Sequence, residues 1–173
     1  MFDPTVFENL KVAFENQIYD LDTLDRQVDI INRVDRLELA VMSREFSLQF
    51  TLTGRPAVSA EIQLTASLKD LAVELLELKG ETPACTLRLR FHMQVHRVAD
   101  QCKQVEDIIQ QIWEPEIAPT QTLSHLFGAE TTSYANVIEL GFHRKINEEQ
   151  MEDIPELTQH VIQTLAKLTE IAD

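Results

Sequence analysis

Glycine and cysteine are scarce in this chain, which has four glycines and two cysteines among 173 residues. Loops that wrap a nucleotide phosphate need glycine, because only glycine lets the backbone come close to the phosphate. The chain has neither a glycine-rich phosphate loop nor a G-x-S-x-G nucleophile turn,. We therefore predict no nucleotide or other cofactor, and we find no motif for serine-type catalysis.

Long apolar runs and an amino-terminal cluster of lysines are also missing. No stretch approaches the 18 or so apolar residues that a membrane helix needs, and MFDPTVFENL carries acids where a secretory signal carries basic residues,. The two cysteines form no CxxC pair and no disulfide framework,. We expect a cytoplasmic protein with free thiols.

Basic residues are few, since 15 lysines and arginines stand against 29 acidic residues, for a formal charge of −14. A negative field of this size repels phosphate backbones and anionic lipid surfaces. We therefore expect no nucleic-acid or membrane partner, and instead a protein or a small molecule. The length and the hydrophobic content of 44% suffice for one core, so we predict one α+β domain over residues 1–173,.

What the chain does have is a ten-residue stretch, LRLRFHMQVH, that alternates without a fault from Leu87 to His96. Successive side chains of a strand point to opposite faces, so this pattern predicts a strand with one apolar and one polar face. The apolar face consists of Leu87, Leu89, Phe91, Met93 and Val95. The polar face consists of Arg88, Arg90, His92, Gln94 and His96.

Apolar residues spaced by three and four predict four helices. The first follows Asp3-Pro4 and has its stripe at Phe7, Leu10, Phe14 and Ile18, with residues 17–21 either helical or a short strand. The second starts at the cap Ser67, ends at Gly80, and turns Leu68, Leu71, Leu75 and Leu76 toward the core,. The others run from Val98 to Trp113 and from Asn147 or Asp153 to near the end of the chain.

Period-two patterns predict the strands around these helices. Three lie between Val28 and Thr65, and another runs from Tyr134 to Ile146. Residues 43–45 form either a hairpin turn, which we favour, or a bulge, and residues 54–56 form a second turn,. The resulting order is α-β-β-β-α-β-α-β-α, a mainly antiparallel sheet of about five strands covered on one face by helices. Residues 114–132 read as a long irregular loop, a candidate lid or docking loop.

The sequence gives little support for a metal site or for a reactive thiol. His92 and His96 would stand about 13 Å apart along a strand, too far to share one ion. The aspartates at 20, 22 and 25 lack the glycine and the final glutamate of a calcium loop,. Cys85 and Cys102 both fall on apolar stripes, where a thiol usually packs as a small hydrophobe. We predict no metal site and two core thiols.

The remaining candidate site is the polar face of the 87–96 stretch. It offers Arg88, Arg90 and His92, joined by His143 if this strand pairs with 134–146. Arginine could orient an anion and histidine could act as an acid or base. We favour the alternative that the arginines pair with carboxylates on neighbouring strands, such as Glu139, Glu38 or Glu61, for a few tenths of a kcal/mol per pair.

Two functions from different classes follow. The first is a non-enzymatic protein-interaction domain, adaptor or chaperone-like, that is dimeric or holds a protein partner on a sheet face or edge. In layout and charge the chain is similar to small acidic secretion chaperones, which place helices at both ends of an antiparallel sheet and work as dimers. The alternative is an enzyme or small-molecule binder whose pocket lies between the 87–96 strand and the 114–132 loop and gathers Arg88, Arg90, His92 and His125.

Overall fold

A computed structural model describes residues 5–129 and 132–172. Its α-helices are α1 (Thr5–Thr23), α2 (Leu68–Leu75), α3 (Val98–Trp113) and α4 (Ile154–Ala172), and a short 3-10 helix, η1 (Glu148–Asp153), precedes α4. Its strands are β1 (Val28–Glu38), β2 (Ser43–Leu52), β3 (Arg55–Ala66), β4 (Thr86–Val95), β5 (Thr120–Ser124) and β6 (Tyr134–Gly141).

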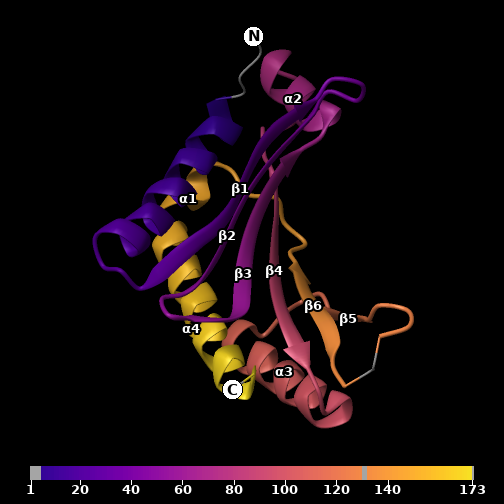
Figure 1. The fold of residues 1–173 in the computed structure, drawn as a ribbon. Coiled ribbons are helices and arrows are strands. Elements are labelled where there is room, and N and C mark those ends of the chain that lie inside the picture. The colour runs from indigo at the N-terminus through magenta and orange to yellow at the C-terminus, as the bar shows by residue number, and fades with distance from the viewer. Residues whose placement is uncertain (1–4, 130–131, 173) are drawn as a thin grey trace.

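The strands form one antiparallel sheet in the order β1-β2-β3-β4-β6-β5 (Figure 1). The predicted α+β class and antiparallel sheet are confirmed, and the sheet has six strands rather than about five. The additional strand is β5, which lies inside the stretch predicted to be irregular. It was missed because it has only five residues, of which just Gln121 and Leu123 are half-buried, so its alternation is weak.

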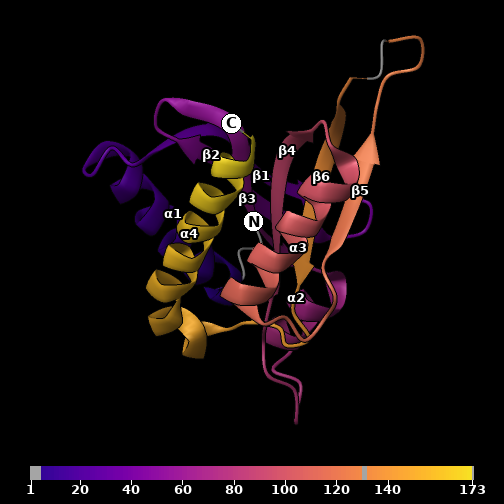
Figure 2. The same cartoon turned by 90° about the horizontal axis from the view of Figure 1, so that it is seen from below.

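Helices α1, α4 and α3 lie along one face of the sheet (Figure 2). Beneath them the apolar side chains of neighbouring strands stand level with one another: Leu64 pairs with Leu87, Ile62 with Leu89 and Ala60 with Phe91. These side chains are almost completely buried. The apolar face of the 87–96 stretch therefore lies at the centre of the core, as its alternation predicted.

Helix α1 confirms its predicted stripe, because Phe7, Leu10, Phe14 and Ile18 are all fully buried. The helix continues to Thr23, which settles the open end of the prediction: residues 17–21 are helical and form no strand. The reason is that Ile18 and Leu21 continue the same buried stripe.

The first hairpin turns earlier than predicted. The turn occupies residues 39–42, with Met42 in the left-handed region at φ 52°, so residues 43–45 belong to β2. A bulge between Ile30 and Asn32 shifts the parity of β1,. It turns Arg33 and Asp35 toward α1, where Asp35 lies 2.7 Å from the Lys11 ammonium.

Helix α2 begins where predicted but does not bury its predicted stripe. Ser67 and Asp70 form the capping box, with Asp70 N–H donating to Ser67 Oγ at 3.2 Å,. Only Leu71 and Val73 are buried, whereas Leu68, Leu75 and Leu76 are more than half exposed. The helix lies at one end of the sheet (Figure 1), where β3 contacts one side of it and leaves the rest uncovered.

The two faces of β4 predict different stabilities for two neighbouring truncations. Phe91→Ala removes a fully buried ring and should destabilise the fold by about 3 kcal/mol, the usual cost of such a cavity,. His92→Ala removes a side chain that is 34% exposed and should cost far less,. Urea denaturation of both variants tests this prediction. Equal midpoints would contradict the assignment of Phe91 to the buried face of β4 and of His92 to the outer face.

Candidate functional site

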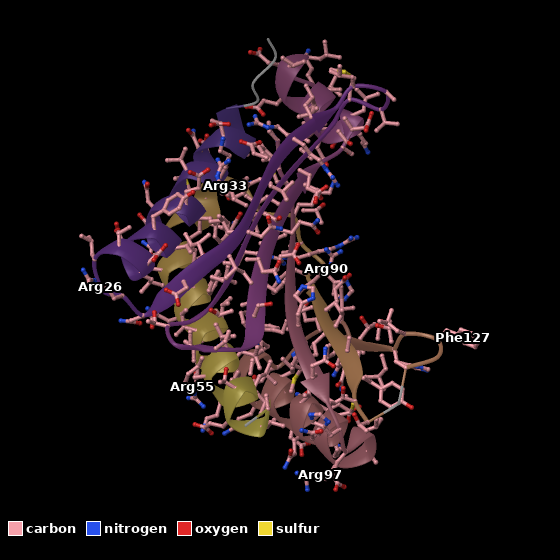
Figure 3. The ribbon with its side chains drawn as sticks, viewed as in Figure 1. Arg26, Arg33, Arg55, Arg90, Arg97 and Phe127 are labelled. Atoms are coloured by element: carbon pink, nitrogen blue, oxygen red, sulfur yellow. The ribbon has the colours of Figure 1, made fainter. Side chains whose placement is uncertain are left out.

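The candidate residues Arg88, Arg90 and His92 lie on the face of the sheet opposite the helices. Strand pairing sets their neighbours: Arg90 stands level with Glu61 of β3 and Glu139 of β6. We call the outward side chains of β2, β3, β4 and β6 the polar face; Arg90, which is labelled in Figure 3, belongs to it. Its chemistry depends on how its charges are compensated.

Arg90 is held between two carboxylates. Its Nε donates to Glu139 Oε2 at 2.8 Å, and its Nη1 lies 3.6 Å from Glu61 Oε1. The hydrogen bond with Glu139 is the main reason that the pKa of Arg90 is raised. Arg88 is half exposed and reaches the other oxygen of Glu139 at 3.9 Å. Both arginines are thus engaged by the same carboxylate.

His92 and Glu61 form the second half of this cluster, with 3.0 Å between Nε2 and Oε2. The hydrogen bond with His92 lowers the pKa of Glu61, with further lowering from the charge of Arg90, and both act against the effect of burial,. The favoured interpretation, cross-strand pairing, is therefore correct for Glu139 and Glu61. Glu38 lies on β1, which β2 and β3 separate from β4, and its carboxylate accepts from the Ala40 N–H at 3.1 Å.

The same kind of bonding continues toward β1. Gln63 donates to Glu45 at 2.9 Å, and the Glu45 carboxylate also accepts from Arg36 at 2.6 Å. Gln49 donates to Ser59 at 2.8 Å. The polar face therefore satisfies much of its hydrogen-bonding capacity internally, which favours a structural role for these groups over a reactive one.

His143 does not join this cluster. Strand β6 ends at Gly141, two residues before it, so the predicted strand 134–146 is shorter than expected. His143 is exposed and borders a hollow of about 320 Å³ beside Trp113, Glu114 and Phe142. Phe142, the residue after the strand, packs against Trp113 with 6.3 Å between ring centroids.

The pocket expected between the 87–96 strand and the 114–132 loop is present only in part. A hollow of about 260 Å³ lies where Arg88 of β4 meets Ile117, Thr120 and Glu139. Arg90, His92 and His125 do not line it. His125 instead packs edge-on against Tyr134, with 5.3 Å between ring centroids, beyond the other end of β5. The four residues of the predicted pocket are not gathered around one cavity.

Sequence reasoning missed two exposed apolar surfaces. The first, which we call the leucine end, combines the β1–β2 turn with α2 and the residues after it, at one end of the sheet in Figure 1. It consists of Leu39, Val41, Leu68, Leu75, Leu76 and Leu78, which are 41 to 73% exposed. A signal existed in the apolar residues Leu39 to Met42, which occupy a turn where polar residues are usual,.

The second surface is the tip of the β5–β6 hairpin, where Leu126 is 79% exposed and Phe127 is fully exposed. Figure 3 shows Phe127 pointing outward from the projecting loop. The Leu-Phe-Gly sequence was a signal for it, since glycine favours a turn and the two apolar residues directly precede it,.

Residues 5–129 and 132–172 contain no cluster of three or more His, Cys, Asp or Glu side chains arranged to hold a metal ion. Over the same residues no helix combines the length and apolar character needed to cross a membrane. Comparisons with protein-family models, with curated proteins and with solved structures find no match for the chain. The comparisons therefore give no indication of function.

The two thiols are shielded from solvent to different extents. Cys85 is buried, and burial raises its pKa to about 12, while partial burial also raises the pKa of Cys102. Because the thiolate is the reactive form, we predict that Ellman's reagent labels the folded Cys102→Ser variant negligibly at pH 8. Rapid labelling without denaturant would contradict the buried position of Cys85, and full labelling after unfolding is the control.

The lowered pKa of Glu61 predicts a pH-dependent contribution to stability. A carboxylate whose pKa is lower in the folded state stabilises the fold above its ordinary pKa and loses this effect as the pH falls through the lowered value,. Glu61→Gln should therefore cost up to about 1 kcal/mol near neutral pH. The difference from wild type should shrink below about pH 4.

Denaturation midpoints across this pH range provide the measurement, with Glu81→Gln, at an exposed glutamate, as the control. A difference of the same size at acid and neutral pH would contradict the assigned role of Glu61.

Proposed function

We propose that this protein is a non-enzymatic protein-interaction domain, adaptor or chaperone-like, that acts in the cytoplasm as a dimer and holds apolar segments of partner chains. The observation that carries the proposal is the leucine end. Six large aliphatic side chains are exposed there, from α2, the residues after it and the β1–β2 turn.

The size of this surface supports binding. The six residues expose on the order of 600 Å², at the upper limit of apolar patches on monomeric proteins and close to the roughly 800 Å² that each partner buries in a standard interface. Covering them removes apolar area from water, which is the main driving force of association. A surface of this kind suits an apolar or amphipathic segment of another protein.

The charge of the molecule supports the same function. A protein with a net charge of −14 stays soluble through self-repulsion even while it exposes leucines,. A bound apolar segment would then be kept in solution by the acidic body that carries it. This combination suits an adaptor or a holding chaperone.

The polar face supports a non-enzymatic function. Its best acid–base candidate, His92, is engaged by Glu61, and its arginines are engaged by Glu61 and Glu139. A substrate anion would have to displace these carboxylates before it could bind the arginines, at a cost in free energy. The pairs instead bring β3, β4 and β6 into one register.

A holding assay with reduced insulin as the client tests the proposal. We expect the wild-type protein to suppress the light scattering that follows insulin reduction, and Leu76→Asp to lose most of this suppression, because a charge in the leucine end opposes apolar contact. Leu24→Asp is the matched control, since Leu24 is as exposed as Leu76 but lies in the turn after α1. Equal activity of Leu76→Asp and wild type, or equal loss in both variants, would contradict a role for the leucine end.

A further inference from the structure

Strand β5 forms an open edge of the sheet. It pairs with β6 on one side, and in the described part of the chain no strand pairs with its other side. Figure 2 shows β5 at the border of the sheet, with the hairpin tip continuing beyond it. The outer backbone groups of β5 are therefore available to another strand.

This edge lacks the features that usually prevent strand pairing. Native edge strands are commonly protected by charged side chains, proline or bulges. The other edge, β1, has a bulge and five charged residues: Asp29, Arg33, Asp35, Arg36 and Glu38. Strand β5, TQTLS, has no charge, no proline and no bulge in its pairing with β6. Of the two edges, β5 is therefore the less protected against strand addition.

Side chains on the helix-covered side of β5 hold this edge strand in place. Gln121 donates to the Cys102 carbonyl of α3 at 3.0 Å and accepts from Asn136 of β6 at 2.9 Å. Leu123 packs against the core. A strand already fixed in its extended conformation loses little conformational entropy when a second strand binds, which favours association.

Apolar groups flank β5 at both ends. Leu126 and Phe127 project beyond its last residue. Ile117 and Ala118 precede its first residue and border the hollow of about 260 Å³ next to Arg88. One end thus carries projecting apolar groups, and the other end has a recess lined by apolar side chains together with polar ones such as Arg88 and Glu139.

We propose that β5 pairs antiparallel with β5 of a second copy about a two-fold axis at Thr122, so that one sheet runs through both copies. This register pairs all five residues of each strand. Beyond the five paired residues, the same arrangement directs the hairpin tip of one copy, with Leu126 and Phe127, toward the Ile117 and Ala118 end of the other copy. The projecting end of each copy thereby covers the recessed end of the other. The same contact forms twice, as a two-fold interface requires.

A second copy suits this edge better than an unrelated extended peptide. A peptide could satisfy the backbone groups of β5, but another copy also brings its own exposed Leu126 and Phe127 toward Ile117 and the hollow,. The uncharged edge also limits repulsion between two chains that each carry a charge of −14,. The inference specifies the dimer of the proposed function and rests on it, but uses a surface separate from the leucine end.

Sedimentation equilibrium of the full chain tests the interface. We expect a wild-type dimer and, for Thr122→Lys, a dissociation constant raised at least about tenfold, because the two lysines would face each other across the axis. Asn32→Lys is the matched control, since it adds the same charge to an exposed position on the opposite edge strand. It should leave the dimer unchanged.

A cross-linking experiment tests the register directly. Cα atoms of opposed antiparallel residues lie about 4.5–5.5 Å apart, within the range of a disulfide. In a Cys102→Ser background, Thr122→Cys should form a disulfide-linked dimer on mild oxidation, whereas Asn32→Cys should not.

A monomeric wild-type protein, or a dimer unaffected by Thr122→Lys and not linked through Cys at 122, would overturn the inference. The insulin assay measures client holding at the leucine end and does not depend on β5. Failure of the β5 interface is therefore distinguishable from failure of the proposed holding function.

Discussion

The strict alternation of β4 between β3 and β6 is the constraint on which the rest of the structure depends. The side-chain period of a strand is two, so a slip of one residue in register would exchange Phe91 with His92 and place arginines under the helices. Both neighbours match the alternation: Ala60 and Ile138 meet Phe91 on the inner face, while Glu61 and Glu139 meet Arg90 on the outer face. Burial on one side and charge pairing on the other therefore select the same register.

This two-sided match determines where function can reside. The helices cover the inner face, and the outer face bonds largely to itself through Arg90, His92 and their carboxylates. Groups that looked reactive in the sequence are thereby used to hold strands together. The surfaces left with unsatisfied apolar area lie at the periphery, in the leucine end and around β5.

These two surfaces lie in different parts of the molecule, as Figure 1 shows for α2 and the β5–β6 hairpin. One surface can hold a partner segment while the other joins two copies, because neither occupies the place of the other. Pairing through β5 would present two leucine ends in one assembly and raise the effective concentration for a client with two apolar segments. The acidic charge spread over the chain opposes less specific association,.

Local periodicity was sufficient to predict the buried stripe of α1, the capped start of α2 and the two faces of β4, because each depends on the spacing of residues within one element. Residue types also indicated that Arg90 would meet Glu139 or Glu61, but strand pairing decided that it meets both. Tertiary structure alone decided that Leu75 and Leu76 are exposed, since an apolar stripe says nothing about whether a neighbour covers it. It likewise decided that Thr120–Ser124 becomes a strand, because so short a segment is stabilised by its pairing with β6 rather than by its own pattern,.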